Sequence, residues 1–432
     1  MNNPSNTSQV KIILVNKTDS KGGAAIACNR LLKALDSHLL EAKLLVQEKY
    51  IIDELIETTT NSSYKKFSNF FNFAFEKFLF LFHERSKDIR FAFSVANTGE
   101  DISKNKTLKE ADIIHLHWIN AGFLSLDSLK KIFKTKKPII WTLHDMWAFT
   151  GGCHYSLNCT GYKSTCSHCP FLRKPSGKDL SNRHFNNKID IYSEAKNLTF
   201  VTCSNWLGNI ARESMMLKDF RIETIPNPIN INIFKPTDKA IARHNLQLPS
   251  DKILILFGAA NVLDKRKGLK YFSGAMNFLS ENHPELKDKI ELVVFGKKSA
   301  ANEMLDLPFK VNSLSVISSE EKLAELYNAV DLFVLPSMED NLPNTIMESF
   351  SCGTPAVGFK IGGIPEMIDH KQNGYIAKYK STEDLAEGIY WATCIADKTA
   401  LSENARKKVM ENYSPEIIAK KYKQLYNEIL TN

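Results

Sequence analysis

Short apolar runs alternate with helical patterns along almost the whole chain. The N-terminal half contains VKIILV, AKLLVQ, DIIHLHW, PIIWTLHD and LTFVTCS, and helical spacing follows the first run in AAIACNRLLKAL. Short runs rich in Ile, Val and Leu are typical of buried parallel strands. The pattern therefore predicts an α/β fold in which parallel sheets are covered by helices.

Prolines interrupt this pattern in IETIPNPININIFKP, which predicts a linker. The alternation then restarts with KILILFG, IELVVFG, DLFVLPS, PAVGF and GYIAKY. We expect two Rossmann-like domains, residues 1–235 and 236–413, that face each other across an interdomain cleft. Such sheets bind ligands at the carboxyl ends of their strands. The tail SPEIIAKKYKQLYNEIL has a helical apolar stripe, so it needs a surface to pack on.

Residues 64–93 break the alternation, because they hold ten of the 26 phenylalanines. A helical projection gathers most of them on one face, together with Ala74 and Leu81. Two interpretations stay open: a helix packed on the domain core, or an interfacial helix that contacts a membrane surface. Cationic residues flank the phenylalanines and favour the second, and liposome binding would distinguish the two. They are Lys65, Lys66, Lys77, Arg85, Lys87 and Arg90.

Composition narrows the class of protein. A chain with 43% hydrophobic and 24% charged residues is globular and not disordered. The net charge of +8 is spread along the chain without a nucleic-acid-binding motif, so it fits anionic small molecules or an anionic membrane surface. We see no secretory signal and no apolar run of ~18 residues. The expected location is cytoplasmic, or peripheral on the inner face of the plasma membrane.

The stretch SMEDNLPNTIMESFSCGTP carries candidate chemistry. Pro343 precedes a helix expected from about Asn344, Glu348 lies just over one turn into it, and Asp340 lies in the preceding loop. A helix N-terminus is a natural seat for a phosphate, and a nearby carboxylate can accept hydrogen bonds from a diol. The stretch therefore suits a nucleotide-sugar. Taken alone, the stretch fits a capped surface helix with incidental acids somewhat better than a binding site.

A second constellation is GGCHYSLNCTGYKSTCSHCP, with four cysteines in seventeen residues. The spacing is irregular for a zinc site, although one end is C-x-x-C. A structural zinc, reduced thiols and disulfides stay open; a reducing compartment disfavours the last. The candidate ligands are Cys153, Cys159, Cys166 and Cys169, with His154 and His168 nearby.

The order of these segments resembles the retaining glycosyltransferases of the GT-B fold, family 4 (glycosyltransferase group 1), over nearly the whole chain. The resemblance rests on GGAAIACNRLLKAL, IIHLHW, FVTCSNWL, IETIPNPININIF, DKRKG, DLFVLPSMEDNLPNTIMESFSCGTPAVGF and GGIPEMI with NGYIA. TLHDMWAFTGGCHY and DNLPN are similar to bacterial exopolysaccharide, capsule and colanic-acid-type transferases. The resemblance implies that a C-terminal helix, residues 414–432, packs back on the N-terminal domain.

The resemblance implies donor-binding roles in the second domain. Glu348 would hold the ribose hydroxyls and Asp340 the hydroxyls of the transferred sugar, while Glu339 is one residue out of register. The family has a glutamate where this chain has Asp340, which is a departure. Asn344 and Thr345 would offer the helix N-terminus to the donor.

The same resemblance indicates which cationic residues would contact the donor diphosphate. Lys267 falls on the family lysine that neutralises the leaving diphosphate. The family arginine is missing, because Ala259, Ala260 and Asn261 occupy that region. Arg266 is expected to replace it.

The first domain would contribute to the site as well. His117 falls on the family's active-site histidine, and His144 and Asp145 would line the acceptor cleft. Gly22 and Gly23 resemble the family's glycine loop, which lets the backbone approach the donor phosphates or the acceptor.

The predicted reaction moves a sugar from a nucleoside-diphosphate-sugar to a lipid-linked glycan, as in the biosynthesis of exopolysaccharide, capsule or lipopolysaccharide. No D-x-D motif occurs, so no catalytic metal or other cofactor is expected. The family's front-face route implies retention of configuration. Two alternatives stay open: a sugar-nucleotide 2-epimerase of the same fold, and a catalytically inactive scaffold that binds sugar or lipid.

Overall fold

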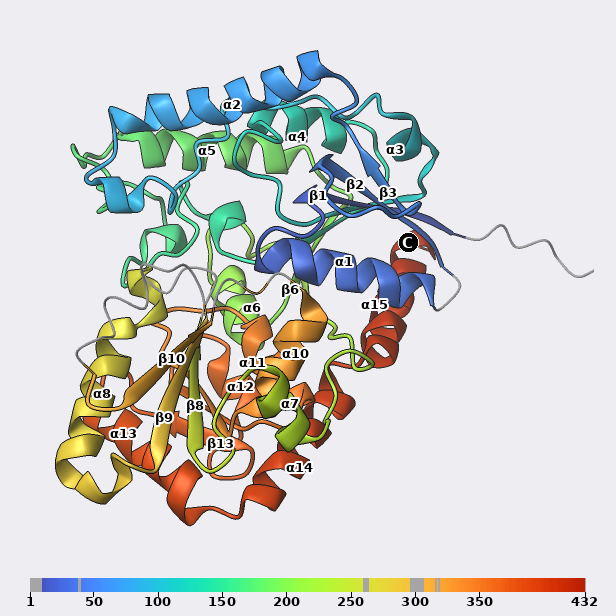
Figure 1. The fold of residues 1–432 in the computed structure, drawn as a ribbon. Helices are drawn as coiled ribbons and strands as arrows, with labels where there is room; N and C mark the ends of the chain where they lie inside the picture. The colour runs from blue at the N-terminus through green and yellow to red at the C-terminus, as the bar shows by residue number, and fades with distance from the viewer. Residues whose placement is uncertain are drawn as a thin grey trace, which may run out of the picture. The chain divides into compact units, whose positions relative to one another are not determined.

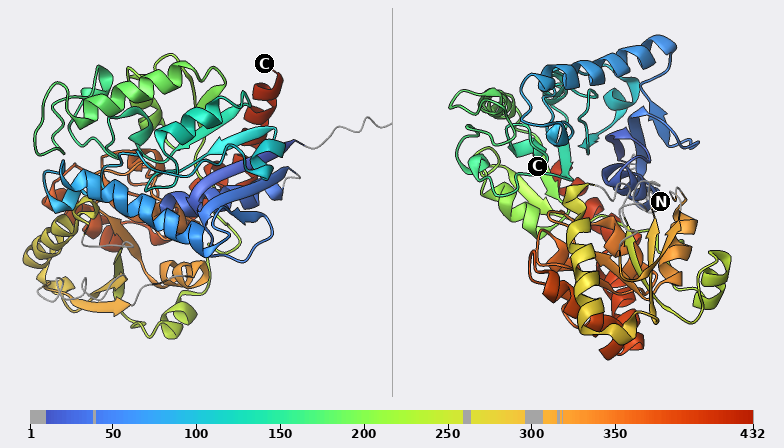
Figure 2. Two further views of the ribbon diagram at one scale, coloured as in Figure 1. Left: turned by 90° about the horizontal axis from the view of Figure 1, so that it is seen from above. Right: turned by 60° about the vertical axis from the view of Figure 1, so that its left-hand side comes forward.

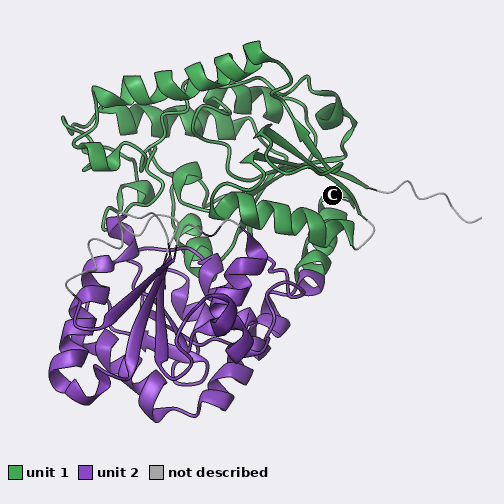
Figure 3. Ribbon diagram, viewed as in Figure 1, with its two compact units in different colours: residues 1–226, 418–432 green, residues 227–417 purple. Residues whose placement is uncertain are grey.

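The computed structural model describes residues 10–37, 40–258, 264–295, 307–314, 317 and 319–431 (Figure 1). The chain divides into two compact units, which are coloured separately in Figure 3. Unit 1 comprises residues 1–226 and 418–432, and unit 2 comprises residues 227–417. The division at Pro226 falls inside the proline-containing segment 222–236, where the sequence predicts a linker.

Unit 1 is built on a seven-stranded sheet in which all strand pairs are parallel. The strand order is β3-β2-β1-β4-β5-β6-β7, so the order reverses between β1 and β4. Ligands of doubly wound sheets bind beside such a reversal, outside the carboxyl ends of the strands. The strands are β1 (Lys11–Thr18), β2 (Glu41–Glu48), β3 (Ile56–Thr58), β4 (Ile113–Leu116), β5 (Ile139–Leu143), β6 (Leu198–Thr202) and β7 (Arg221–Thr224).

Helices cover both faces of this sheet, because alternate strand residues are apolar in both directions. Ile13 and Val15 share a core with α4 and α5, while Ile12 and Leu14 share the opposite core with α1 and α15. The helices of unit 1 are α1 (Gly23–Asp36), α2 (Ser63–Leu81), α3 (Lys106–Glu110), α4 (Leu126–Phe133), α5 (Leu180–Ser193), α6 (Asn205–Arg212) and, from Ile418 on, α15 (Pro415–Thr431).

The C-terminal helix α15 belongs to the core of unit 1 from Ile418 onward. Tyr422 and Tyr426 are fully buried, and each hydroxyl reaches a polar side chain of the sheet. The Tyr426 hydroxyl lies 2.9 Å from His115 Nδ1, and the Tyr422 hydroxyl lies 3.0 Å from Thr142 Oγ1. His115 is thereby satisfied on both ring nitrogens, since its Nε2 lies 2.7 Å from Thr142 Oγ1.

Unit 2 repeats the plan with a six-stranded sheet of parallel pairs in the order β10-β9-β8-β11-β12-β13. Helices α8 and α13 pack on one face, and Tyr327 of α10 contacts Phe333 of β11 on the other. The strands are β8 (Ile253–Gly258), β9 (Ile290–Phe295), β10 (Lys310–Leu314), β11 (Leu332–Leu335), β12 (Ala356–Phe359) and β13 (Gly374–Ala377). The helices are α7 (Lys239–Asn245), α8 (Leu269–Asn282), α10 (Glu320–Ala329), α11 (Asn344–Ser351), α12 (Ile364–Met367), α13 (Thr382–Tyr390) and α14 (Lys398–Asn412).

The predicted fold class of two parallel-sheet Rossmann-like domains is therefore confirmed. Within the described ranges, no helix is both long and apolar enough to cross a bilayer. Helix α2 lies on the outside of unit 1, at its edge in Figure 1 and again in the right-hand view of Figure 2.

Candidate active site

Two loops of unit 2 bring Lys267 and Asp340 together. They follow β8 and β11, which are neighbours in the sheet, so both loops lie at the carboxyl edge. Lys267 ends a short helical turn, η4 (Lys265–Lys267), and its Nζ donates a hydrogen bond of 2.8 Å to Asp340 Oδ2. Ser337 Oγ lies 3.4 Å from the same oxygen. The fold therefore brings together Lys267, the cation predicted for the leaving group, and Asp340, the carboxylate predicted to bind the sugar.

Asp340 is a buried but ionised carboxylate. Burial by itself raises the pKa of this group, and the charges of Lys267 and then Arg266 more than offset that effect, so the pKa lies below its usual value. Arg266 Nη1 lies 3.9 Å from Asp340 Oδ2 and donates to the Glu339 carbonyl at 3.0 Å. Arg266 thus lies near Asp340, and its role in place of the family arginine stays a prediction. Ala259, Ala260 and Asn261, at the position of the missing arginine, lie outside the described residues.

Glycines fix the backbone around this cluster. Gly268 has φ 75°, and a Cβ there would lie 1.9 Å from the Pro336 carbonyl oxygen. Gly362 has φ 60°, and a Cβ there would lie 1.9 Å from the Asp340 carbonyl oxygen. Gly363 N–H donates to that same carbonyl at 3.1 Å. The close approaches and the left-handed backbone both require glycine, so these contacts set where the Asp340 loop can lie.

Glu348 is buried on α11, with 3% of its surface exposed. The Tyr327 hydroxyl donates to Glu348 Oε2 at 3.3 Å. Pro343 precedes the helix and provides no side-chain cap, and the first turn carries no acidic residue. The N-terminal end, with Asn344 and Thr345, therefore keeps the positive partial charge that favours an anion. Tyr327 is a contact that sequence reasoning missed, because it comes from a different helix.

Unit 1 carries a pair of neutral histidines at the ends of β4 and β5. His117 Nδ1 lies 3.0 Å from His144 Nε2. Burial lowers the pKa of His117 well below its usual value, with further lowering from His115 and His144, and lowers the pKa of His144 to about 4. Both rings are therefore uncharged at neutral pH and act as hydrogen-bonding groups.

The outer nitrogen of His117 is available for a ligand. His117 Nε2 and Asn120 Oδ1 are buried atoms that have no hydrogen-bond partner within the described part of the chain. Both residues line one cavity of about 10 Å³, together with His144 and Asp145. Such a volume holds about one water molecule. A buried polar atom without a partner is costly, so two beside one cavity mark a place where a ligand hydroxyl or water binds.

Asp145 is held by three donors and is not free to move. Its Oδ2 lies 2.8 Å from His154 Nδ1 and accepts from Trp118 Nε1 at 3.1 Å, while its Oδ1 accepts from Trp147 N–H at 2.8 Å. These partners, His154 first, lower the pKa of Asp145 despite its burial. Asp145 therefore orients His154 and the indole of Trp118. His154 lies within hydrogen-bond distance of Asp145 and Ser94. The sequence had grouped it with the cysteines as a residue near the candidate zinc ligands.

The glycine pair precedes helix α1. Gly22 has φ 95°, and a Cβ placed on it would meet nothing within 4 Å. Gly23 is the first residue of α1. Glycine is therefore needed at residue 22 for its backbone conformation, and the space beside it is open.

The four clustered cysteines line one small cavity of about 20 Å³. All are free thiols, as are the other four cysteines of the chain. Burial raises the pKa of Cys166 to about 12 and that of Cys169 to about 11. Among described residues, no three or more His, Cys, Asp or Glu side chains form a group that could hold a metal ion. The zinc hypothesis for Cys153, Cys159, Cys166 and Cys169 stays a prediction, which metal analysis of the purified protein tests.

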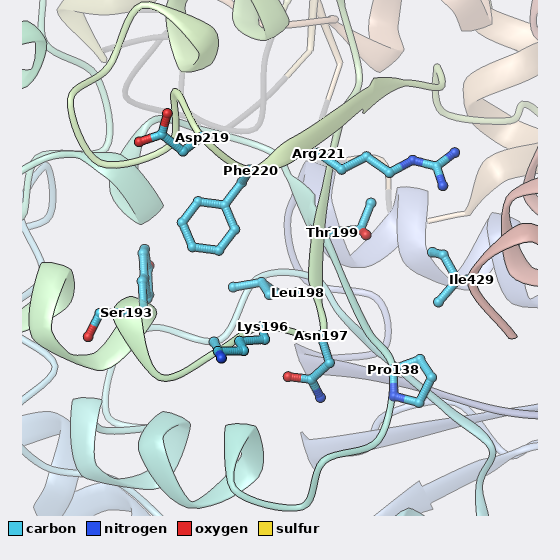
Figure 4. A pocket seen from close by; sticks show the side chains of 12 residues that line it. Pro138, Ser193, Lys196, Asn197, Leu198, Thr199, Asp219, Phe220, Arg221 and Ile429 are labelled. Atoms are coloured by element: carbon cyan, nitrogen blue, oxygen red, sulfur yellow. The ribbon is translucent and has the colours of Figure 1, made fainter. Parts of the chain in front are cut away.

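A larger cavity lies at the other edge of the unit 1 sheet (Figure 4). Its volume is about 710 Å³, and its lining includes Pro138, Leu198 and Arg221, which lie at or next to the amino ends of β5, β6 and β7. Ligands of such sheets bind at the opposite edge. We therefore do not assign the donor or the acceptor to this cavity.

Family models decide the class of protein. The model described as "Glycosyl transferases group 1" matches residues 238–408, and the model "Glycosyltransferase Family 4" matches residues 72–233. The chain belongs to these glycosyltransferases. The predicted family and the GT-B fold are thus confirmed.

Several known proteins are similar to this glycosyltransferase. WcaC of Escherichia coli K12, named for colanic acid biosynthesis, is 25% identical over 300 residues, which cover 65% of this chain and 69% of WcaC. The N,N'-diacetylbacillosaminyl-diphospho-undecaprenol alpha-1,3-N-acetylgalactosaminyltransferase of Campylobacter jejuni is 28% identical over 214 residues, 47% of this chain and 53% of that enzyme. The solved structure of Anabaena HepE with UDP-glucose shares the fold, with a TM-score of 0.62 at 15% identity over 97% of this chain and 100% of HepE.

Proposed function

We propose that this glycosyltransferase transfers a sugar from a nucleoside-diphosphate-sugar to a hydroxyl group of a lipid-linked glycan, with retention of configuration. The observation that carries the proposal is the Lys267–Asp340 pair beside α11, with Glu348 buried on that helix. One unit thus offers a cation for a diphosphate and two acceptor-only carboxylates for hydroxyl groups. These are the groups that a nucleotide-sugar needs.

In the proposed reaction the bond between the anomeric carbon and the diphosphate oxygen breaks, and its electron pair leaves with the diphosphate. The acceptor oxygen forms the new bond on the same face of the sugar, and its proton passes to the departing phosphate oxygen. Lys267, Arg266 and the N-terminus of α11 stabilise the growing negative charge. The proposal therefore needs no bound metal ion.

His117 has a role in orientation under this proposal. Its Nδ1 is engaged by His144, so only Nε2 can reach a ligand. A neutral imidazole can donate to or accept from a sugar hydroxyl without adding charge. Asp340 and Glu348 would hold the sugar and the ribose hydroxyls, respectively.

The relatives support the choice of substrates. HepE was solved with UDP-glucose, and the name of the Campylobacter enzyme specifies an acceptor on diphospho-undecaprenol. WcaC is named for an exopolysaccharide. We extend these properties to the present protein as part of the proposal, in which the product is a surface polysaccharide.

A two-step experiment tests the proposal. Thermal unfolding is first measured with UDP-, GDP- and ADP-sugars, and one donor class is expected to raise the midpoint. That donor is then incubated with undecaprenyl-diphosphate-linked sugars, and NMR identifies the first-formed anomer. Retained configuration in EDTA supports the proposal, and an inverted product overturns the retaining route. Donor turnover to an epimer without acceptor would identify an epimerase, and donor binding without any turnover would identify a scaffold.

A further inference from the structure

Helix α2 presents a row of phenylalanines to solvent. Phe67, Phe70, Phe71, Phe78 and Phe82, which directly follows the helix, have exposed fractions between 54 and 68%. Phe70 and Phe71 lie three and four residues after Phe67, Phe78 lies seven residues after Phe71, and Phe82 lies four residues after Phe78, so the five residues lie along one side of the helix. We call these five residues the phenylalanine face. Tyr64 and Leu81 of the same helix are exposed as well, and so is Phe91, which follows it in the sequence.

The opposite side of α2 holds the helix on unit 1 through polar contacts. Asn69 and Glu76 are buried: Asn69 Nδ2 donates to Thr60 Oγ1 at 2.7 Å, and Glu76 Oε2 accepts from Gly122 N–H at 3.0 Å. Phe80 is buried on the same side. The polarity of the helix is therefore inverted, with its polar anchors inside and its aromatic row outside.

This inversion excludes one of the two interpretations that the sequence left open. A helix packed on the core by its phenylalanines would bury them, and the structure exposes them instead. Turning the row inward would break the buried bonds of Asn69 and Glu76, which is unfavourable for groups without water. The core-packing interpretation of the phenylalanine face is therefore wrong.

The exposed rings are not all scattered single residues, because two pairs of rings on this helix contact each other. Phe71 stacks on Phe75 with ring centroids 5.6 Å apart, and Phe78 meets Phe82 edge to face at 5.2 Å. Single exposed apolar residues are ordinary, whereas a contiguous patch marks a surface that binds a partner or a membrane.

The charged residues in and just after α2 favour an anionic bilayer as the partner of the phenylalanine face. The only acidic residue of α2 is Glu76, whose side chain is fully buried. Three cations, Lys66, Arg85 and Lys87, are exposed in and just after the helix, while Asp88 is the exposed acid of that segment. An amphipathic helix with aromatic residues on one face and basic residues beside them is suited to lie in the interface of an anionic membrane.

We propose that α2 seats this protein on an anionic lipid bilayer through the phenylalanine face. The 19-residue helix would lie flat over ~28 Å of membrane surface. Its rings would enter the boundary between headgroups and acyl chains, and Lys66, Arg85 and Lys87 would contact lipid phosphates. The inference stands on the exposed surface alone and does not depend on the proposed donor or acceptor.

Vesicle sedimentation tests the proposal. The protein is mixed with vesicles of phosphatidylcholine alone or with 30% phosphatidylglycerol, and we expect stronger binding to the anionic vesicles. Phe70→Ser combined with Phe78→Ser should lower the partition coefficient at least tenfold. Ile52→Ser, at another exposed apolar residue of unit 1, is the matched control and should change it little. Unchanged thermal unfolding of the double variant shows that it remains folded.

A fluorescence measurement locates the helix. All five tryptophans of the chain lie outside α2, so Phe71→Trp adds a probe to the phenylalanine face. Its added emission should be quenched by brominated phosphatidylcholine in anionic vesicles, and that of Ile52→Trp should not. Absence of vesicle binding by the unaltered protein overturns the proposal. So does equal binding by the double serine variant, or self-association through this face in place of vesicle binding.

Discussion

Lys267 Nζ and Asp340 Oδ2 lie 2.8 Å apart, so the residues assigned to the leaving diphosphate and to the transferred sugar form an ion pair. The pair holds Asp340 ionised in a buried position, because Lys267 is the largest of the effects that lower its pKa. The carboxylate in turn fixes the direction of the ammonium group. Each residue therefore positions the other before it contacts a substrate.

Lys267→Met should reduce kcat/KM roughly a hundred- to thousandfold, the usual cost of removing one electrostatic contact to a developing oxyanion. Most of the loss should fall on kcat, because the charge on the diphosphate grows in the transition state. Steady-state kinetics with the donor found in the thermal screen measures it. Lys270→Met, on the exposed side of α8, is the matched control. An equal loss in both variants would contradict the assignment.

Glu348→Gln should weaken binding of the nucleoside diphosphate by roughly ten- to a hundredfold, because hydrogen bonds to a charged group contribute about 1.5–3 kcal/mol. The substitution keeps the shape of the side chain and a bond to the Tyr327 hydroxyl. Calorimetric titration with the free nucleotide isolates binding from chemistry. Glu339→Gln, one residue out of register, should leave the affinity within about twofold. A larger loss of affinity for Glu339→Gln than for Glu348→Gln would contradict the assignment of Glu348 as the residue that binds the ribose.

Local patterns predicted the sheets well. The apolar runs became β1, β4, β5, β8 and β11, because a buried strand needs apolar residues in consecutive positions. The resemblance singled out Lys267, Asp340 and Glu348 from short motifs at strand ends and at a helix start, and the structure brings Lys267 and Asp340 into contact; their roles stay predictions. In each case the information lies within a few neighbouring residues.

Contacts between distant segments could not be predicted in the same way. Periodicity identified an apolar face on α2, but the direction of that face depends on Thr60 and Gly122, which belong to other elements. The partner of His154 is Asp145, and nothing in the spacing distinguished that carboxylate from the nearby thiols. The direction of a helix face and the partner of a histidine depend on which side chains the whole fold buries. The residues next to them in the sequence do not determine this burial.

Buried histidines should make unit 1 less stable in acid. Burial lowers the pKa of His115 and His184 to about 3 and that of His144 to about 4, whereas an unfolded histidine titrates near 6.5. Between these values the unfolded chain binds protons that the folded chain does not. The stabilisation is therefore complete above pH 6.5 and is lost as the pH falls, by about 1.4 kcal/mol per pH unit for each histidine.

Urea unfolding between pH 7 and 4.5 measures how steeply the free energy of unfolding falls with pH. His184→Gln should reduce this pH dependence by the contribution of one histidine, whereas His244→Gln, at an exposed position, should leave it unchanged. His184 lies outside the proposed active site, so the measurement is independent of activity. Identical slopes for both variants would show that His184 does not stay neutral in the folded protein.

Lys188 should make the folded protein more stable as the pH rises above 7. Its buried side-chain nitrogen donates to the Trp147 carbonyl at 2.5 Å and the Thr150 carbonyl at 3.0 Å, and lies 3.6 Å from the centre of the Trp147 ring. Burial lowers its pKa to about 7, against 10.5 normally. Between these values the unfolded chain holds a proton that the folded chain does not, so this lysine favours folding increasingly as the pH rises.

Lys188→Met removes both the hydrogen bonds and this pH dependence. We expect a loss of about 2–4 kcal/mol in the free energy of unfolding, because the Thr150 carbonyl loses its hydrogen bond and the Trp147 carbonyl keeps only a long one, from Thr150 N–H at 3.4 Å. The difference between the unaltered protein and the variant should widen from pH 7 to 9, where the unaltered protein gains stability that the variant cannot. Urea unfolding at pH 7, 8 and 9 gives the difference directly, and Lys196→Met at an exposed position is the control. A difference that stays constant over this range would mean that Lys188 is charged in the folded protein, held by its two carbonyls and the indole ring.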